Sequence, residues 1–297
     1  GRRPAVRPPE RDHRRADLRH RRQVGDSRRA GTRDVRPGAP QDGAAVDRER
    51  VLTERLVLAH GFTQTARSWA HVETLLRARL ADIETIAVDL PGHGDSTAPT
   101  DADLWASADH LVEVGGPATY VGYSMGGRVA LHAALSHPDE VRALVLIGAT
   151  AGIVDETERA ARRAADERLA ERIDEIGVEA FVDEWLANPL VAGLRAETAL
   201  RADRLRNTAV GLAVCLRSTG TGTQEPLWGR LASITVPALV LAGEHDAKFR
   251  ELGARLAAEL PDARFDVVPA AGHTVPLEQP DATADAIASW FRSTARR

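Results

Sequence analysis

The stretch GYSMGG, residues 122–127, decides the fold of this chain. The apolar residues 118–121 before it are predicted to form a short buried strand, and the residues after it a helix. A serine at such a junction lies in a tight, strained turn, where side chains two positions away would collide with the backbone. Gly122 and Gly126 remove those side chains, and the helix N-terminus directs amide N–H groups toward Ser124. The pattern predicts an exposed nucleophilic serine rather than a plain Ser/Gly loop.

Predicted strands and helices alternate along most of the chain. The strands are predicted at 56–59, 84–89, 118–121, 141–147, 236–242 and 264–268, and the helices at 66–80, 102–114, 128–135, 249–260 and 281–293. Such alternation is typical of a mostly parallel sheet with helices on both faces. A G-x-S-x-G turn between strand and helix is the nucleophile elbow of the α/β-hydrolase fold. We therefore expect an α/β protein of that fold, with a mostly parallel, doubly wound sheet.

The alternation is interrupted once. Residues 155–218 are rich in Arg, Glu and Ala, contain no strand-like run, and are predicted to be helical throughout. We expect residues 152–228 to form a helical lid inserted into a core made of residues 51–151 and 229–297.

The charge of the chain is unevenly distributed. Residues 1–50 contain 15 Arg and 8 acidic residues, a net charge of +7, whereas residues 51–297 contain 24 basic and 35 acidic residues, a net charge of −11. The first 50 residues include one Leu and no Phe, Trp, Tyr, Ile or Met, so they cannot bury a core. We expect a disordered, Arg-rich extension without function; a basic arm that contacts an anionic surface is the alternative. The acidic remainder argues against nucleic acid as a partner.

Few features point to a compartment or an assembly. The single cysteine, Cys215, excludes a disulfide framework within the chain and favours a reducing cytoplasm. No run of 18 apolar residues could span a membrane, and the first residues contain no apolar signal segment. The sequence leaves the oligomeric state open.

The residues that would activate the serine follow later strands. A serine hydroxyl needs a base, and the base needs an orienting acid; in this fold they occur in the order Ser, Asp or Glu, His. Asp246 follows the strand 236–242, and His273 follows the last predicted strand. We predict a Ser124–His273–Asp246 triad. Glu244 is the alternative acid. His245 is the competing base, but it lies too near the acid in sequence to span the site.

Two backbone N–H groups are needed to stabilise a developing oxyanion. Met125 follows the nucleophile directly, and Phe62 follows the His60-Gly61 turn after the first strand, so we predict these two donors. His93, in the loop after the second strand, is given no catalytic role. No His, Cys, Asp and Glu cluster has metal-ligand spacing, and no phosphate-binding glycine loop occurs. We expect neither a metal nor a cofactor.

The sequence resembles the MenH family, the 2-succinyl-6-hydroxy-2,4-cyclohexadiene-1-carboxylate synthases of menaquinone biosynthesis, over residues 55–293. The resemblance lies in GYSMGGRVA (122–130), GEHDAKF (243–249), the Arg-rich run 159–172, FVDEWLANP (181–189) and LRN (205–207). The lid motifs are the specific part, because elbow and triad are shared with generic esterases. One departure is that the family has strands before the His60-Gly61 strand, whereas residues 1–50 contain no strand-like run.

The resemblance implies a lyase that eliminates pyruvate from 2-succinyl-5-enolpyruvyl-6-hydroxy-3-cyclohexene-1-carboxylate, a small molecule with three carboxylates. It implies proton abstraction and β-elimination, with Ser124 as the base, deprotonated by His273 and supported by Asp246. The substrate-binding residues that it implies are Tyr123, Arg128, Arg162, Trp185 and Arg206. Arginine suits this role because its planar fork binds a carboxylate through two hydrogen bonds.

Two other functions stay open at this point. A carboxylesterase or a carbon–carbon bond hydrolase of the same fold would use Ser124 as a nucleophile and would have an apolar pocket without an arginine cluster. A ligand receptor that retains the triad would bind tightly without turnover.

Overall fold

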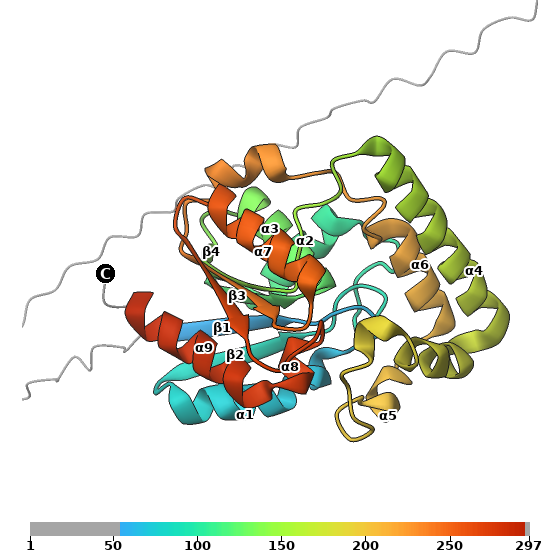
Figure 1. The fold of residues 1–297 in the computed structure, drawn as a ribbon, viewed down its shortest axis with the longest axis horizontal. Helices are drawn as coiled ribbons and strands as arrows, with labels where there is room; N and C mark the ends of the chain where they lie inside the picture. The colour runs from blue at the N-terminus through green and yellow to red at the C-terminus, as the bar shows by residue number, and fades with distance from the viewer. Residues whose placement is uncertain (1–53, 295–297) are drawn as a thin grey trace, which may run out of the picture. The chain divides into compact units, whose positions relative to one another are not determined.

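A computed structural model describes residues 54–294 of the chain (Figure 1). These residues form one six-stranded sheet in the order β2-β1-β3-β4-β5-β6, and every neighbouring pair of strands is parallel. The strands are β1 (Glu54–Ala59), β2 (Ile83–Val88), β3 (Ala118–Tyr123), β4 (Val141–Ile147), β5 (Ala238–Gly243) and β6 (Ala263–Val268). The expectations for residues 1–50 fall outside the described residues.

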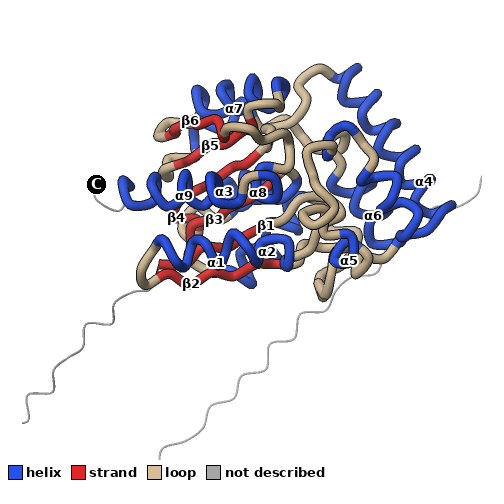
Figure 2. The backbone as a smooth tube through the Cα atoms, turned by 60° about the horizontal axis from the view of Figure 1, so that its bottom comes forward, coloured by secondary structure: helices blue, strands red, loops and turns tan. Residues whose placement is uncertain are grey.

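Helices cover both faces of the sheet, as Figure 2 shows. They are α1 (Ala70–Arg79) and α9 (Pro280–Thr294) on one face, and α2 (Leu104–Gly115), α3 (Met125–Ser136) and α7 (Ala247–Glu259) on the other. Successive side chains of a strand point to opposite faces. In β1, Leu56 and Leu58 therefore join the core under α1 and α9, whereas Val57 joins the core under α2, α3 and α7. The prediction of a mostly parallel, doubly wound α/β-hydrolase sheet is confirmed.

Between β4 and β5 the chain leaves the sheet and forms the segment predicted as a lid, residues 152–228, which we call the insertion. Its helices are α4 (Glu156–Leu186), α5 (Arg201–Arg204) and α6 (Ala209–Thr219). In Figures 1 and 2, α4 and α6 lie together to one side of the sheet. They share a small apolar core that includes Ile173, Phe181 and Leu212. The insertion therefore packs around hydrophobic contacts of its own.

The prediction of continuous helix over residues 155–218 is wrong. Gly177 interrupts α4 with a φ of 76°, a backbone conformation that glycine adopts without a steric penalty. After α4, Asn188 caps a short 3-10 helix, Pro189–Val191, and irregular chain then leads to α5. Two further short elements also escaped prediction, the 3-10 helix Trp228–Ser233 and α8 (Val275–Glu278).

The remaining boundaries agree closely with the expected ones. The predicted helix 66–80 is a 3-10 turn, Ala66–Trp69, followed by α1.

No helix among residues 54–294 is long and apolar enough to cross a membrane.

Candidate active site

Ser124 occupies the strained turn that its sequence predicts. It lies between β3 and α3 with a φ of 51° and a ψ of −106°, and its N–H donates to Ile147 O at 2.8 Å. A Cβ on Gly122 would lie 2.5 Å from the Gly126 carbonyl carbon, and a Cβ on Gly126 would lie 2.5 Å from the Ala59 carbonyl carbon. Real Cβ atoms do not approach backbone this closely, so both positions require glycine.

His273 lies between the serine and an aspartate. Its Nε2 is 3.2 Å from Ser124 Oγ, and its Nδ1 is 2.7 Å from Asp246 Oδ2. With a neutral imidazole, Nδ1–H donates to the carboxylate, and Nε2 accepts the serine hydroxyl proton. The histidine is 5% exposed, and the Phe249 ring packs on it at 4.4 Å between centroids. The arrangement orients the imidazole and partly excludes water from it.

The structure places both partners of the serine on loops that follow strands. Asp246, after β5, also caps α7 by accepting the Phe249 N–H at 3.1 Å. Burial raises the pKa of Asp246, but the hydrogen bond and charge of His273, with smaller contributions from the Phe249 N–H and Lys248, outweigh it and hold the pKa below its usual value. The alternative acid, Glu244, accepts from Ala270 N at 2.8 Å and so braces the histidine loop instead.

The two predicted oxyanion donors belong to two segments that one backbone hydrogen bond joins. Met125 is the first residue of α3, and Phe62 follows β1. Gly126 N donates to His60 O at 3.0 Å, which holds the end of β1 against the elbow. Within the part of the chain that the structure describes, neither the Met125 N–H nor the Phe62 N–H has a recorded acceptor. Both donors are therefore free to bind a negatively charged oxygen.

A cavity of about 840 Å³, part of it open to solvent, joins the core and the insertion. The core contributes Phe62, Tyr123, Ser124, Met125, Arg128 and His273 to its lining, and the insertion contributes Arg162, Trp185 and Arg204. The Trp185 ring packs edge-on against Phe62 at 5.3 Å between centroids. Burial raises the pKa of Tyr123, so its hydroxyl stays protonated.

Arg128 is a buried cation in the cavity. It is 8% exposed, and its Nη1 donates to Thr219 O at 2.7 Å and to Gln224 Oε1 at 3.4 Å. Burial lowers its pKa to about 10, so it remains charged near neutral pH. Arg162 enters from α4, with Nε 2.8 Å from Asp166 Oδ1, and its side chain is 43% exposed.

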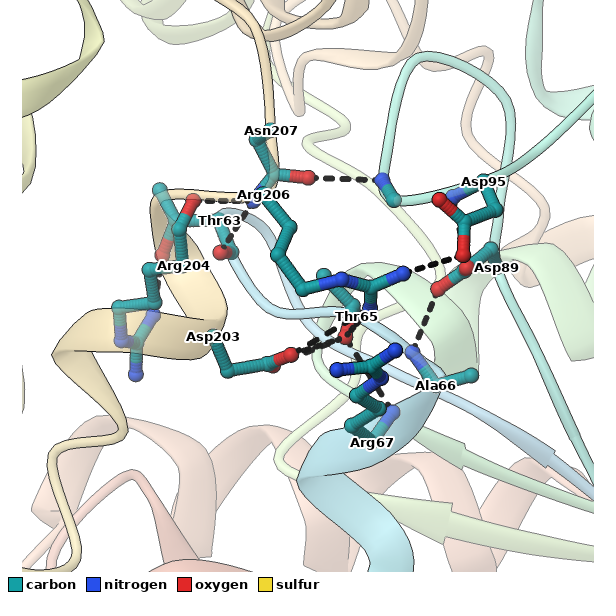
Figure 3. Close-up of polar contacts among 11 residues, drawn as sticks. Thr63, Thr65, Ala66, Arg67, Asp89, Asp95, Asp203, Arg204, Arg206 and Asn207 are labelled. Carbon is teal, nitrogen blue, oxygen red and sulfur yellow. Dashed lines mark hydrogen bonds and ion pairs between the residues drawn. The ribbon is translucent and has the colours of Figure 1, made fainter.

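Arg206 does not take the place that the sequence resemblance implies. It is absent from the cavity lining, and its guanidinium pairs with Asp95 and, at 3.5 Å, with Asp203 (Figure 3). Arg204, two residues earlier, lines the cavity instead. Arg204 is the last residue of α5, whereas Arg206 lies in the turn that follows it, and the two guanidinium groups have different partners. The orientation of so short a helix and of the turn after it cannot be predicted from the sequence, so Arg204 was missed.

Arg204 is 1% exposed, which makes it one of the largest fully buried side chains among the described residues. Its Nε donates to Ala199 O at 2.8 Å, its Nη1 donates to Thr63 Oγ1, and its buried Nη2 has no partner in the described structure. Burial lowers its pKa to about 10. A buried cation is costly unless it is paired, and within the described residues Arg204 has no carboxylate hydrogen-bonded to it.

No group of three or more His, Cys, Asp or Glu side chains between residues 54 and 294 could hold a metal ion. The chemistry available in the cavity is that of an activated serine, free backbone donors and three arginines.

The comparison with known proteins agrees with this architecture. Residues 56–286 match the model of the alpha/beta hydrolase family. A relative from Bacillus subtilis (strain 168), named a candidate 2-succinyl-6-hydroxy-2,4-cyclohexadiene-1-carboxylate synthase, is 37% identical over 250 residues, which are 80% of this chain and 90% of the relative. The synthase of that name from Enterobacter sp. (strain 638) is 34% identical over 80% of this chain and 91% of its own length.

Among solved structures, MenH from S. aureus superposes with a TM-score of 0.76 at 31% identity, covering 82% of this chain and 95% of that chain. A thermophilic esterase from Thermogutta terrifontis, solved with malate bound, superposes with a TM-score of 0.68 at 28% identity, covering 81% and 90%. Both structures superpose over most of this chain, and the sequence identity is higher for the synthases than for the esterase. The chain therefore belongs to the alpha/beta hydrolase family and, within it, to the family of the 2-succinyl-6-hydroxy-2,4-cyclohexadiene-1-carboxylate synthases.

Proposed function

We propose that this protein is a 2-succinyl-6-hydroxy-2,4-cyclohexadiene-1-carboxylate synthase, a lyase of menaquinone biosynthesis that releases pyruvate from 2-succinyl-5-enolpyruvyl-6-hydroxy-3-cyclohexene-1-carboxylate. The observation that carries the proposal is the composition of the cavity. Three arginines face a serine–histidine–aspartate arrangement, and two of them, Arg128 and Arg204, are buried without a carboxylate hydrogen-bonded to them in the described structure. The names of the relatives support the same reaction.

The substrate and product define which bonds change. The ring proton at C2 is acidic because C2 is adjacent to the succinyl ketone, and its removal gives an enolate. The electron pair then forms the C2–C3 double bond, the C3–C4 double bond moves to C4–C5, and the bond from C5 to the enolpyruvyl oxygen breaks. The leaving enolpyruvate takes up one proton and becomes pyruvate. Because a double bond separates the two sites, the elimination is 1,4 rather than a simple β-elimination.

In the proposed mechanism Ser124 removes the C2 proton while His273 holds the proton of the serine hydroxyl. Asp246 orients the imidazole and stabilises its charged form. The proton on His273 then neutralises the leaving enolpyruvate, so that the enzyme regains its starting state. The N–H groups of Phe62 and Met125 bind the enolate oxygen, whose negative charge develops in the transition state for removal of the C2 proton.

The arginines account for the charge of the substrate. It carries one carboxylate on the ring, one on the succinyl chain and one on the enolpyruvyl group, and we propose that Arg128, Arg162 and Arg204 bind them. Tyr123 and Trp185 line the cavity between these cations. Arg204 replaces Arg206 in this assignment, since Arg206 pairs with Asp95 and Asp203. We also propose that the insertion is a lid over the substrate and that the protein is cytoplasmic, which its single cysteine supports.

The decisive test is pyruvate release, followed by coupled oxidation of NADH by lactate dehydrogenase. We expect turnover by the wild-type protein, no measurable turnover by Ser124→Ala, and a loss of about 10- to 100-fold in kcat/KM for Arg128→Ala. Rapid hydrolysis of p-nitrophenyl esters without pyruvate release would assign the protein to the esterases instead. Tight substrate binding without any turnover would indicate a receptor.

A further inference from the structure

Residues 203–207, which we call the anchor segment, connect the insertion to two loops of the core (Figure 3). Its centre is Asn207, which is 4% exposed. Asn207 Nδ2 donates to Thr63 O at 2.7 Å and to Arg204 O at 3.0 Å, and its Oδ1 accepts from Gly94 N at 2.9 Å. One buried amide therefore joins the loop after β1 to the loop after β2.

Charged groups surround this amide. Thr65 Oγ1 donates to the Asp203 carboxylate, at 2.8 Å from each oxygen. Arg206 pairs with Asp95 and Asp203, as the dashed lines in Figure 3 show. The anchor segment thus contacts each core loop both through Asn207 and through a charged side chain.

Thr63 is the residue in these loops that most needs support. It is fully buried and has a φ of 66°, in the left-handed region that β-branched residues rarely adopt. Such a conformation is strained and persists only where surrounding contacts hold it. The anchor segment supplies two of these contacts, because Asn207 binds the Thr63 carbonyl and Arg204 binds its hydroxyl.

Thr63 shares a tight turn with Phe62. Gln64 N donates to Gly61 O at 3.1 Å, which closes a four-residue turn whose central residues are Phe62 and Thr63. A positive φ at the third position is typical of a type II turn, where glycine or asparagine is preferred. If Thr63 relaxed to a negative φ, the turn would rearrange and the Phe62 N–H would move with it.

We propose that Asn207 is a positioning residue: it holds Thr63 in the left-handed conformation, and thereby the Phe62 N–H in the oxyanion site, only while the anchor segment is seated on the core. This inference rests on the proposed function in that Phe62 serves as an oxyanion donor. The oxyanion site is then complete only when the anchor segment contacts the core.

The first test is Asn207→Asp, which keeps the size of the side chain and its acceptor for Gly94 N but replaces the donor to Thr63 O by an acceptor. We expect kcat for pyruvate release to fall about 10- to 100-fold with KM within threefold, because a misplaced oxyanion donor affects the transition state. The matched control is Asn188→Asp, since Asn188 uses only its acceptor, toward Leu190 N at 2.9 Å. An unchanged kcat for Asn207→Asp would overturn the proposal.

The second test is rescue through Thr63. Glycine adopts a positive φ without help, so in a Thr63→Gly background the Asn207→Asp change is expected to lower kcat by less than threefold. A purely structural role for Asn207 predicts the same loss of kcat and of Tm in both backgrounds, and that result would refute positioning through Thr63.

A third measurement separates this inference from the proposed reaction. Diethyl p-nitrophenyl phosphate reacts with an activated serine: Ser124 Oγ bonds to phosphorus, p-nitrophenolate leaves, and the serine proton passes to His273. The developing charge on the phosphoryl oxygen needs the same N–H donors. We expect Asn207→Asp to slow p-nitrophenolate release at least tenfold, whether or not pyruvate is formed. Equal rates for variant and wild type, or no reaction of the wild type, would overturn the inference; slowed release without pyruvate formation would refute only the proposed reaction.

Discussion

Replacing Gly126 by alanine tests the steric account of the elbow. The new Cβ would lie 2.5 Å from the Ala59 carbonyl carbon and 2.8 Å from His60 O. The Ala59 oxygen would lie closer still than its carbon, so the start of α3 must move by more than about 0.9 Å away from the end of β1 to reach ordinary contacts of 3.4 Å. That movement separates Ser124 and the Met125 N–H from the loop that carries Phe62, and it stretches the Gly126 N to His60 O bond.

We expect Gly126→Ala to lower kcat by about 100-fold, since a displacement of 1 Å in an active site costs roughly that much. Packing strain of about 1–3 kcal/mol lowers the Tm by roughly 2–4 °C for each kcal/mol. Pyruvate release and thermal unfolding measure the two effects. The matched control is Gly229→Ala, an exposed site where a Cβ meets nothing within 4 Å and where we expect no change. A kcat within threefold of wild type for Gly126→Ala would refute the steric argument.

Three further predictions concern charge and protonation. Arg204→Ala should raise KM about 10- to 100-fold, because Arg204 lines the cavity. Arg206→Ala and the exposed control Arg201→Ala should change KM less than threefold, since both arginines pair with carboxylates of the protein. A larger rise in KM for Arg206→Ala than for Arg204→Ala would identify Arg206 as the substrate-binding arginine. Asp246→Asn should lower kcat by about 10³–10⁴-fold in the pyruvate assay, because an amide donor facing Nδ1 selects the wrong imidazole tautomer; a tenfold loss would be too small for this role. Burial, and next the nearby His60, lower the pKa of His93 from 6.5 to about 3. Between these two pH values the unfolded chain therefore binds one proton more than the folded chain does. The free energy of unfolding then rises with pH by up to about 1.4 kcal/mol per pH unit. His93→Gln should lower the slope of stability against pH by that amount, in urea unfolding measured at pH 4.5 and 6, while the buried His60 and His132 keep their own contributions. An unchanged slope would contradict the argument.

The core of the fold could be predicted from the sequence because short sequence patterns determine its strands and its elbow. Apolar runs of four to seven residues predicted the strands, and glycines two residues before and after Ser124 predicted the elbow. The triad residues followed from their positions after strands, and the structure brings Asp246 and His273 to Ser124 in that order along the chain.

The insertion was less readable because tertiary contacts determine its course. Its polar composition favours helix throughout, yet Gly177 and Pro189 divide it, and irregular chain follows. The sequence alone could not decide whether Arg204 or Arg206 lines the cavity, because this depends on the orientation of the four-residue helix α5 and of the turn after it. The positive φ of Thr63 gave no sequence signal either, since threonine is unusual there.

The way the site is divided between segments bears on how this family can diversify. The core carries the serine, its partners and the backbone donors, whereas the insertion packs α4 on α6 through its own apolar contacts and carries Arg162, Trp185 and Arg204. Mutations in the insertion outside residues 203–207 can therefore change which substrate is accepted, whereas mutations within the anchor segment are expected to disturb the Phe62 N–H as well. In evolutionary terms the catalyst and most of its selectivity are inherited as two parts of the chain, joined through Arg128 of the core and the anchor segment of the insertion.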